Sequence, residues 1–163
     1  MKIKIDRLGL FGDGVADGPI FAPMTLPGEL VEGDVVGDKM ATPRIVEPSP
    51  DRVKPPCSHF KSCGGCSMQH LRDDKLAEWK LDVVKNALTA REITAPIRGI
   101  HTSPASSRRR ASFSGKRTKS GAMVGFHQRA SDVLIEVPNC KLLHPDLMAS
   151  LPILQDFVVT GAS

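Results

Sequence analysis

The chain has 163 residues, of which 40% are hydrophobic and 25% are charged, and its formal net charge is +4. This composition is that of a soluble protein with one core or two small ones, and no stretch reaches the roughly 18 apolar residues that a transmembrane helix needs. The N-terminus lacks the apolar region of a secretion signal, so the cytoplasm is the expected location and a membrane partner is excluded.

The charges are unevenly distributed along the chain. Residues 1–51 hold five Lys and Arg against nine Asp and Glu, residues 52–129 hold sixteen against five, and residues 130–163 hold one against four. A solvated surface usually mixes the two signs, whereas a basic region between acidic ends indicates a surface for a polyanion. Nucleic acid is therefore the expected partner.

The N-terminal region predicts a small all-β barrel. Short alternating runs at residues 3–8, 19–22, 30–36 and 41–46 are typical of strands. The glycine-rich stretch Gly12–Gly18 is interpreted as a turn, because a phosphate-binding loop needs a helix directly after it and a strand follows here. Phe11 and Phe21 are candidates for stacking on bases, but because the chain has so few aromatic residues we assign them to the barrel core. Four prolines within residues 47–56 predict a stiff linker and a domain boundary near residue 50.

Residues 73–92 show apolar side chains at helical spacing and two acidic residues in the first turn, which predicts a helix with a core-facing stripe. Alternation over 109–115 and 122–128 predicts a β-hairpin. Residues 144–159 again have helical spacing, and Pro152 within them predicts either one kinked helix or two short ones.

Basic side chains cluster on and beside the predicted hairpin. A few of them would suit an exposed sheet edge protected from aggregation by charge, but so many with almost no nearby acid favour contact with RNA or DNA. The candidates are Arg108, Arg109, Arg110, Lys116, Arg117, Lys119 and Arg129.

The four cysteines, Cys57, Cys63, Cys66 and Cys140, form a close triplet and a remote single residue. In a reducing cytoplasm, clustered cysteines indicate metal ligands or catalysts rather than disulfides. Structural zinc sites usually show two close pairs, so the spacing favours an iron-sulfur cluster, in which distant cysteines each bind one corner. A zinc site completed by His59 and His70 stays an alternative, and buried thiols without a metal stay a third.

Several motifs in order resemble one family. The stretches "LGLFGDGVADG", "CSHFKSCGGCSMQH", "RRRASFSG", "MVGFHQR" and "VPNCKLLHP" resemble the N-terminal half of the S-adenosylmethionine-dependent RNA uracil-5-methyltransferases, and most closely the 23S ribosomal RNA branch. The resemblance implies an α+β fold: an OB-like TRAM barrel that binds RNA at residues 1–50, then a central α/β domain at 51–163, incomplete at its C-terminal end. It also implies a 4Fe-4S cluster held by the four cysteines.

The family reaction needs a nucleophilic thiol and a site for S-adenosylmethionine. If all four cysteines bind iron, no thiol is left, and no glycine loop precedes a helix to hold the methyl donor. The resemblance therefore places catalysis and S-adenosylmethionine in a Rossmann-like domain absent from this chain, and no catalytic residue is assigned. We expect a monomeric RNA-recognition part, inactive alone, of an enzyme that acts on ribosomal RNA, with transfer RNA as the alternative substrate. The alternatives are a stand-alone nucleic-acid-binding module with a structural metal, or a redox protein.

Overall fold

The computed structural model describes residues 1–161 and divides into two compact units. Unit 1 comprises Met1–Lys54 and Met68–Thr102, and unit 2 comprises Pro55–Ser67 and the chain from Ser103 onward. The units are therefore interleaved along the chain. The functional division into an RNA-binding domain at 1–50 and an iron-sulfur domain at 51–163 stays a prediction. Among residues 1–161, neither helix has the length and apolar character needed to cross a membrane.

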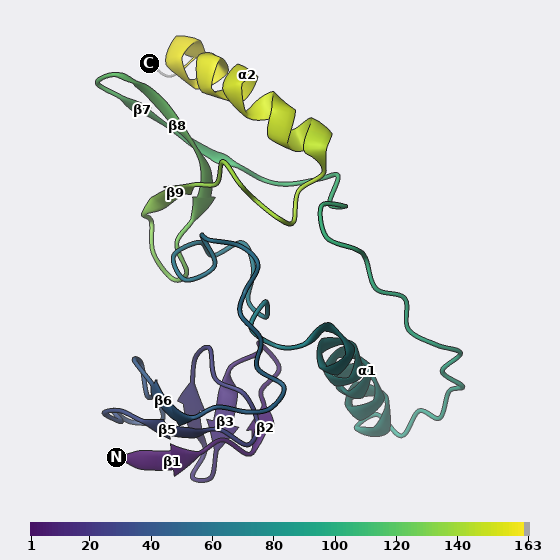
Figure 1. The fold of residues 1–163 in the computed structure, drawn as a ribbon. Coiled ribbons are helices and arrows are strands. Elements are labelled where there is room, and N and C mark those ends of the chain that lie inside the picture. The colour runs from purple at the N-terminus through teal and green to yellow at the C-terminus, as the bar shows by residue number, and fades with distance from the viewer. Residues whose placement is uncertain (162–163) are drawn as a thin grey trace. The chain divides into compact units, whose positions relative to one another are not determined.

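Unit 1 contains two three-stranded antiparallel sheets, with strand orders β1-β5-β6 and β2-β3-β4 (Figure 1). The run predicted at residues 3–8 is split between the sheets, because the chain changes partner at Ile5: its amide donates to Glu29, and the next amide donates to Val15. The strands are β1 (Lys2–Lys4), β2 (Arg7–Leu8), β3 (Gly14–Ala16), β4 (Ile20–Ala22), β5 (Leu30–Glu32) and β6 (Arg44–Glu47).

Strand β3 lies where the sequence predicted only a turn. The prediction was wrong because Gly14 serves packing rather than turning: a Cβ there would lie 2.1 Å from the Thr25 hydroxyl oxygen. The strand is buried along its whole length. A core cluster is shared by both sheets and consists of Ile3, Ile5, Ala16, Ala22, Val31 and Met40.

Phe11 is not in the core, contrary to the sequence prediction. Its residue surface is 85% exposed, at the tip of the turn between β2 and β3. Phe21, on β4, is partly buried, as a core-edge residue would be.

Helix α1 spans Asp73–Thr89 and confirms the predicted helix. Its predicted core-facing stripe is correct only near the N-terminus of the helix. There Leu76 and Trp79 pack on a small apolar cluster of Leu26, Met68 and Leu71. No residue of α1 is fully buried, so the helix is held to unit 1 mainly by this first part.

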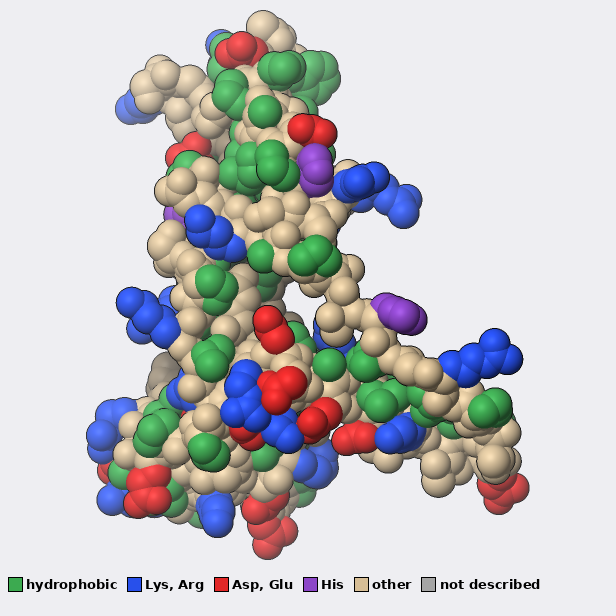
Figure 2. Space-filling view, turned by 45° about the vertical axis from the view of Figure 1, so that its right-hand side comes forward, with side chains coloured by type: hydrophobic (Ala, Val, Ile, Leu, Met, Phe, Trp, Pro, Cys, Tyr) green, Lys and Arg blue, Asp and Glu red, His purple; other side chains and the backbone are tan. Residues whose placement is uncertain are grey.

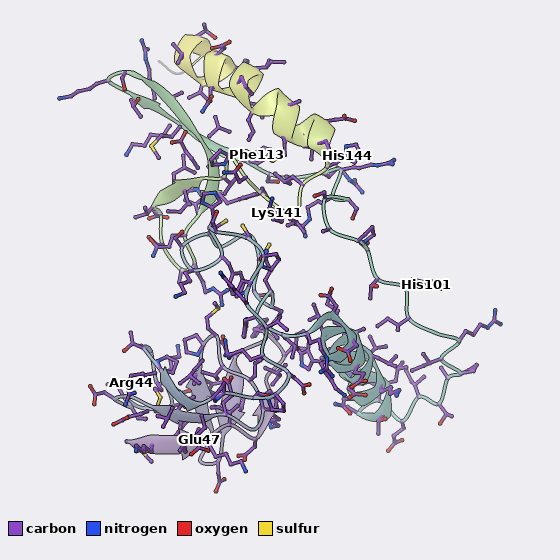
Figure 3. All side chains as sticks on the ribbon, in the orientation of Figure 1. Arg44, Glu47, His101, Phe113, Lys141 and His144 are labelled. Carbon is purple, nitrogen blue, oxygen red and sulfur yellow. The ribbon has the colours of Figure 1, made fainter. Side chains whose placement is uncertain are left out.

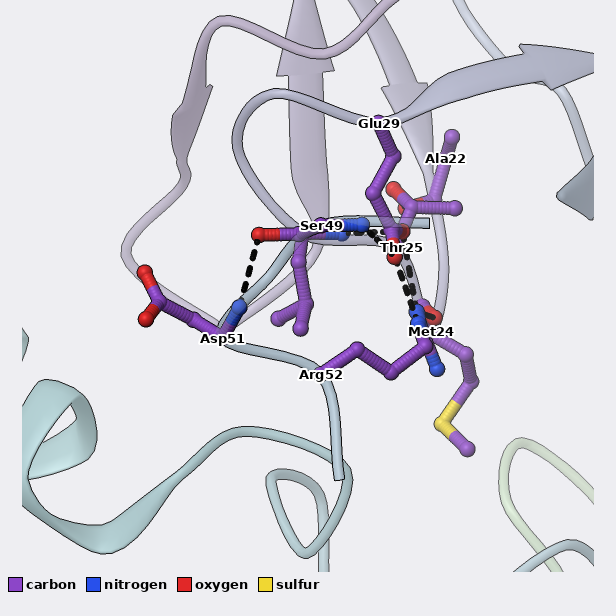
Figure 4. Close-up of polar contacts among 8 residues, drawn as sticks. Ala22, Met24, Thr25, Glu29, Ser49, Asp51 and Arg52 are labelled. Atoms are coloured by element: carbon purple, nitrogen blue, oxygen red, sulfur yellow. Dashed lines mark hydrogen bonds and ion pairs between the residues drawn. The ribbon is translucent and has the colours of Figure 1, made fainter. Parts of the chain in front are cut away.

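A buried ion pair joins the turn before β5 to the segment after β6 (Figure 4). The Glu29 side chain is fully buried, and the Arg52 guanidinium donates to both of its carboxylate oxygens, at 2.5 and 2.9 Å. The backbone amides of Leu26 and Ser49 also donate to this carboxylate, at 2.8 and 3.2 Å. Burial raises the pKa of Glu29, but these hydrogen bonds lower it by more, so the pKa lies below its ordinary value of 4.5.

Residues 51–53 and 70–72 pair with each other beside this ion pair, and we call them the neck. Val53 donates to the carbonyl of His70 at 2.9 Å, and the Arg72 amide donates to the carbonyl of Asp51 at 3.0 Å. The side chains of Arg72 and Asp51 add an ion pair at 3.2 Å. Residues 51–53 of the stretch predicted to be a linker are thus fixed within unit 1.

Unit 2 contains a three-stranded antiparallel sheet in the order β7-β8-β9, covered by one helix (Figure 1). Strands β7 (Ser114–Thr118) and β8 (Gly121–His127) confirm the predicted hairpin, whereas β9 (Leu134–Glu136) was not predicted. Helix α2 (Pro145–Gly161) continues through Pro152 as a single element. It packs closely on β7, since a Cβ on Gly115 would lie 2.3 Å from the Val158 side chain. The antiparallel sheets and the two helices confirm the predicted α+β fold class of the described chain.

Replacing Glu29 by Gln is expected to destabilise unit 1 by about 3 kcal/mol. The change leaves the largely buried Arg52 guanidinium without a counter-charge, and breaking one side of a buried pair costs this order of free energy. Urea unfolding followed by circular dichroism measures it. The matched control is Glu32→Gln, whose partner Arg44 is 71% exposed and whose loss should cost less than about 1 kcal/mol. Equal effects of the two substitutions would contradict the assigned role of Glu29.

The same variant has an expected pH signature. Because the folded-state pKa of Glu29 lies below 4.5, its ionised form contributes stability that is fully present above that pH. This contribution is lost as the pH falls through the folded-state pKa. The stability difference between the native chain and Glu29→Gln should therefore shrink on acidification below pH 4.5. A difference that is constant down to the acid transition would show that the charge of Glu29 is not involved.

Candidate nucleic-acid interface and cysteine loop

Three of the four cysteines lie on Pro55–Ser67, which we call the cysteine loop. The loop is tightly wound: the amides of Ser62 and Cys63 both donate to the carbonyl of His59, at 3.0 and 2.7 Å. The backbone amide of Gly65 points at the Cys63 sulfur, 3.3 Å away. An amide donor at this position stabilises negative charge on the sulfur, which is the state a thiolate ligand requires.

The cysteine loop is attached to the end of β8 by backbone pairing. Gly64 donates to the carbonyl of His127 at 2.9 Å, and Cys63 forms an antiparallel bridge with Gln128. The Arg129 guanidinium adds a hydrogen bond to the carbonyl of Cys66 at 3.2 Å. This close approach requires glycine, because a Cβ on Gly64 would lie 2.6 Å from the His127 carbonyl oxygen.

Cys140 belongs to the same compact unit as the cysteine loop. It follows β9, and its amide donates to the carbonyl of Val137 at 3.2 Å. The next residues pair with the chain before β7: Lys141 accepts from Ser106 at 2.9 Å, and Leu142 accepts from Arg108 at 3.1 Å. Figure 3 shows Lys141 in the segment that leads to α2. Cys140 is thus placed by the sheet and by this second pairing.

The four thiols do not form disulfides. Within residues 1–161, no group of three or more His, Cys, Asp or Glu side chains converges as a single metal ion would require. His59 and His70, the possible zinc partners, fall in different units. The four cysteines fall in one unit, and a cluster that gives each cysteine its own iron does not require their sulfurs to meet at one point. The iron-sulfur cluster and the alternative zinc site therefore both stay predictions.

The predicted basic residues also lie in unit 2. Unit 2 holds nine Lys and Arg against four Asp and Glu, whereas unit 1 holds thirteen against fourteen. Residues 93–131 contain eight Lys and Arg and no acidic residue at all. Figure 2 shows Lys and Arg side chains projecting from the surface. In unit 2, exposed basic side chains precede β7, lie along it, occupy the hairpin turn and follow β8. In this order they are Arg108, Arg109, Arg110, Lys116, Arg117, Lys119 and Arg129.

The sheet register adds Ser114 and His127, which the sequence analysis did not identify, to the candidate RNA contacts. Ser114 and Lys116 alternate with Gly115, so they point away from the face that α2 covers. On the neighbouring strand, His127 shares their face, and its Nε2 lies 2.8 Å from the Ser114 hydroxyl. A hydroxyl, an imidazole and an ammonium group on one open face are suitable donors for phosphate and ribose oxygens. Their only sequence signal is the period of two along each strand.

Comparison with known proteins gives a consistent result, although no family model matches the chain. The chain is 35% identical over 158 residues to a Brucella suis protein named as an RNA methyltransferase, covering 95% of this chain and 38% of that protein. It is 34% identical to the Marinomonas 23S rRNA (uracil(1939)-C(5))-methyltransferase, covering 93% of this chain and 36% of that enzyme. The predicted family resemblance is confirmed.

A solved structure is similar in fold. The tRNA (uracil-54, C5)-methyltransferase of Pyrococcus abyssi, in complex with S-adenosyl-L-homocysteine, matches 99% of this chain with a TM-score of 0.60 at 23% identity. The match covers 37% of that enzyme. This chain therefore spans about two fifths of the length of the curated relatives and of this structure.

Replacing Gly64 by Ala is expected to release the cysteine loop from β8. The added Cβ collides with backbone that has no room to move, and overpacking of this kind costs about 1–3 kcal/mol. The thiols of the metal-free chain should then react about tenfold faster with a thiol reagent, because the loop opens more often. Gly161→Ala is the control, since the nearest atoms to its Cβ lie 3.9 Å away. Unchanged reactivity of Gly64→Ala would mean that the pairing does not hold the loop.

Proposed function

Because this chain is homologous along nearly its whole length to part of proteins named RNA methyltransferases, we propose that it is the RNA-recognition part of an S-adenosylmethionine-dependent RNA uracil-5-methyltransferase. The observation that carries the proposal is that residues 103–131, which hold seven Lys and Arg and no acidic residue, belong to the same unit as a loop with three cysteines. Ribosomal RNA is the proposed substrate class, since relatives at 31% and 34% identity are named 23S rRNA methyltransferases.

RNA binding is assigned to the basic surface of unit 2 and to the OB-like TRAM barrel of unit 1. The basic surface supplies the salt-dependent part of the affinity, because each phosphate contact releases bound counterions. Unit 1 has thirteen basic and fourteen acidic residues, so it attracts a polyanion weakly and contributes through shape and stacking. The hydroxyl and imidazole of Ser114 and His127 are additional contacts on the open face of the unit 2 sheet.

Cys57, Cys63, Cys66 and Cys140 are the proposed ligands of a 4Fe-4S cluster. When bound, the cluster supplies a covalent cross-link between the cysteine loop and the segment after β9. Two features of the chain support this proposal. The amide of Gly65 is directed at the Cys63 sulfur, and hydrogen bonds from Gly64 and Arg129 hold the loop and β8 together. A structural role fits the proposed reaction, since methyl transfer moves no net electrons.

No residue of this chain is proposed to act on the uracil ring. The reaction needs a thiolate nucleophile and a general base, and the four thiols of the chain are committed as ligands in this proposal. The methyl donor and the catalytic thiol are assigned to the part of the relatives' length that this chain does not span.

Replacing Cys140 by Ser is expected to remove the cluster and to lower the melting temperature of unit 2. Loss of a structural metal site costs several kcal/mol. Iron and acid-labile sulfide analysis, visible absorption and thermal unfolding measure both effects. The control is the chelator-treated protein, in which the native chain and the variant should melt alike. A variant that keeps iron, sulfide and melting temperature would contradict the ligand assignment.

Replacing Arg108, Arg109 and Arg110 by Gln is expected to weaken RNA binding and to flatten its salt dependence. Each lost phosphate contact should reduce the slope of log affinity against log salt by about 0.7–0.9. Fluorescence anisotropy at several salt concentrations gives the slope. The control removes the same charge from unit 1 through Lys80→Gln, Lys85→Gln and Arg91→Gln, and its slope should change little. Equal slopes for the two triple variants would assign the arginines to a merely solvated surface.

A further inference from the structure

The turn between β2 and β3, residues 9–13, presents two adjacent apolar side chains to solvent. Leu10 is 67% exposed and Phe11 is 85% exposed. A large apolar pair at a loop tip contributes nothing to the core of unit 1, and its exposure to water is unfavourable. The pair therefore needs an explanation other than folding.

The turn holds Phe11 in this exposed position. Gly9 donates to the carbonyl of Asp13 at 2.8 Å, and Gly12 donates to the carbonyl of Gly9 at 3.0 Å. Gly12 has φ of +88°, and a Cβ there would lie 2.7 Å from the sulfur of Met68. Phe11 cannot reach the core without breaking this hydrogen-bonded turn. The backbone that carries the ring is thus preorganised, which reduces the entropy lost when a partner binds.

The other phenylalanines do not share this setting. Phe113 and Phe126 pair with each other, their ring centroids 5.1 Å apart, and Phe60 is buried. Phe157 is exposed, but it lies one helical turn from the exposed Ile153 on α2, which forms an extended apolar surface. Phe11 instead lies between Leu10 and Gly12 at the tip of a turn, and its high exposure leaves the ring accessible to a flat partner.

We propose that Phe11 is a stacking platform for an unpaired RNA base, with Leu10 packing against the edge of the same nucleotide. This inference rests on the proposed function, which supplies RNA as the ligand class. A phenyl ring stacks on any base, and such stacking is worth about 1–3 kcal/mol per base in single-stranded nucleic-acid binding. Unit 1 is close to neutral, with thirteen basic and fourteen acidic residues, so an uncharged stacking contact is the mode of RNA binding that its surface allows.

The test compares Phe11→Ala with the native chain on two synthetic RNAs, a hairpin with a uridine-containing single-stranded loop and a fully paired duplex of equal length. We expect Phe11→Ala to bind the loop RNA about 5-fold to 100-fold more weakly. Its salt slope and its duplex affinity should be unchanged, because no charge is removed and paired bases offer no free face. Phe11→Trp should retain the native affinity for the loop RNA.

Val36→Ala is the matched control, since Val36 is 81% exposed in another turn of unit 1 and its loss should leave both affinities unchanged. The inference would be overturned if Phe11→Ala bound the loop RNA as tightly as the native chain does. It would also be overturned if the variant lost affinity for the loop RNA and for the duplex by the same factor. If the arginine variants change the salt slope while Phe11→Ala does nothing, only the stacking inference fails. If the native chain binds neither RNA, the proposed function fails with it.

Discussion

The buried carboxylate of Glu29 is the interaction on which unit 1 depends most. A charge without solvent is tolerated only when every lone pair is used, and here Arg52, Leu26 and Ser49 supply the donors. Because these donors come from the turn before β5 and from the segment after β6, the carboxylate fixes where the chain leaves the sheets. Arg52 lies in the neck, so the same ion pair also holds this part of unit 1 on the sheets.

Much of the fold follows from sequence periodicity, and the errors have specific physical causes. The hairpin of β7 and β8 and both helices were predicted, since their patterns extend over many residues. The strand of Gly14–Ala16 was missed because its glycine makes room for Thr25, a contact made by residues that are not neighbours in the strand. Likewise β9 has only three residues and is defined by its partner β8. The two units are interleaved because residues 51–53 pair with residues 70–72 in unit 1, while the loop between them belongs to unit 2. This pairing leaves no periodic pattern in the sequence.

The candidate site was predictable in its chemistry but not in its arrangement. Cysteine spacing and charge distribution identified the ligand candidates and the basic segment, because thiols and charges are visible residue by residue. The pairing of Gly64 with His127, and the proximity of Ser114 to His127, depend on a register that the sequence does not show. Phe11 illustrates the opposite error: the scarcity of aromatic residues favoured the core over base stacking, whereas the residue lies exposed at the tip of a turn.

The contact of Gly12 with Met68 links two positions that are far apart in the chain. Met68 is also part of the apolar cluster beneath α1, together with Leu26 and Leu71. A larger side chain at either position would displace the other, so substitutions there are expected to be energetically non-additive. Among homologous sequences, the residue beneath the helix and the residue in the exposed turn should therefore co-vary, and evolutionary change in the helix packing would shift the turn.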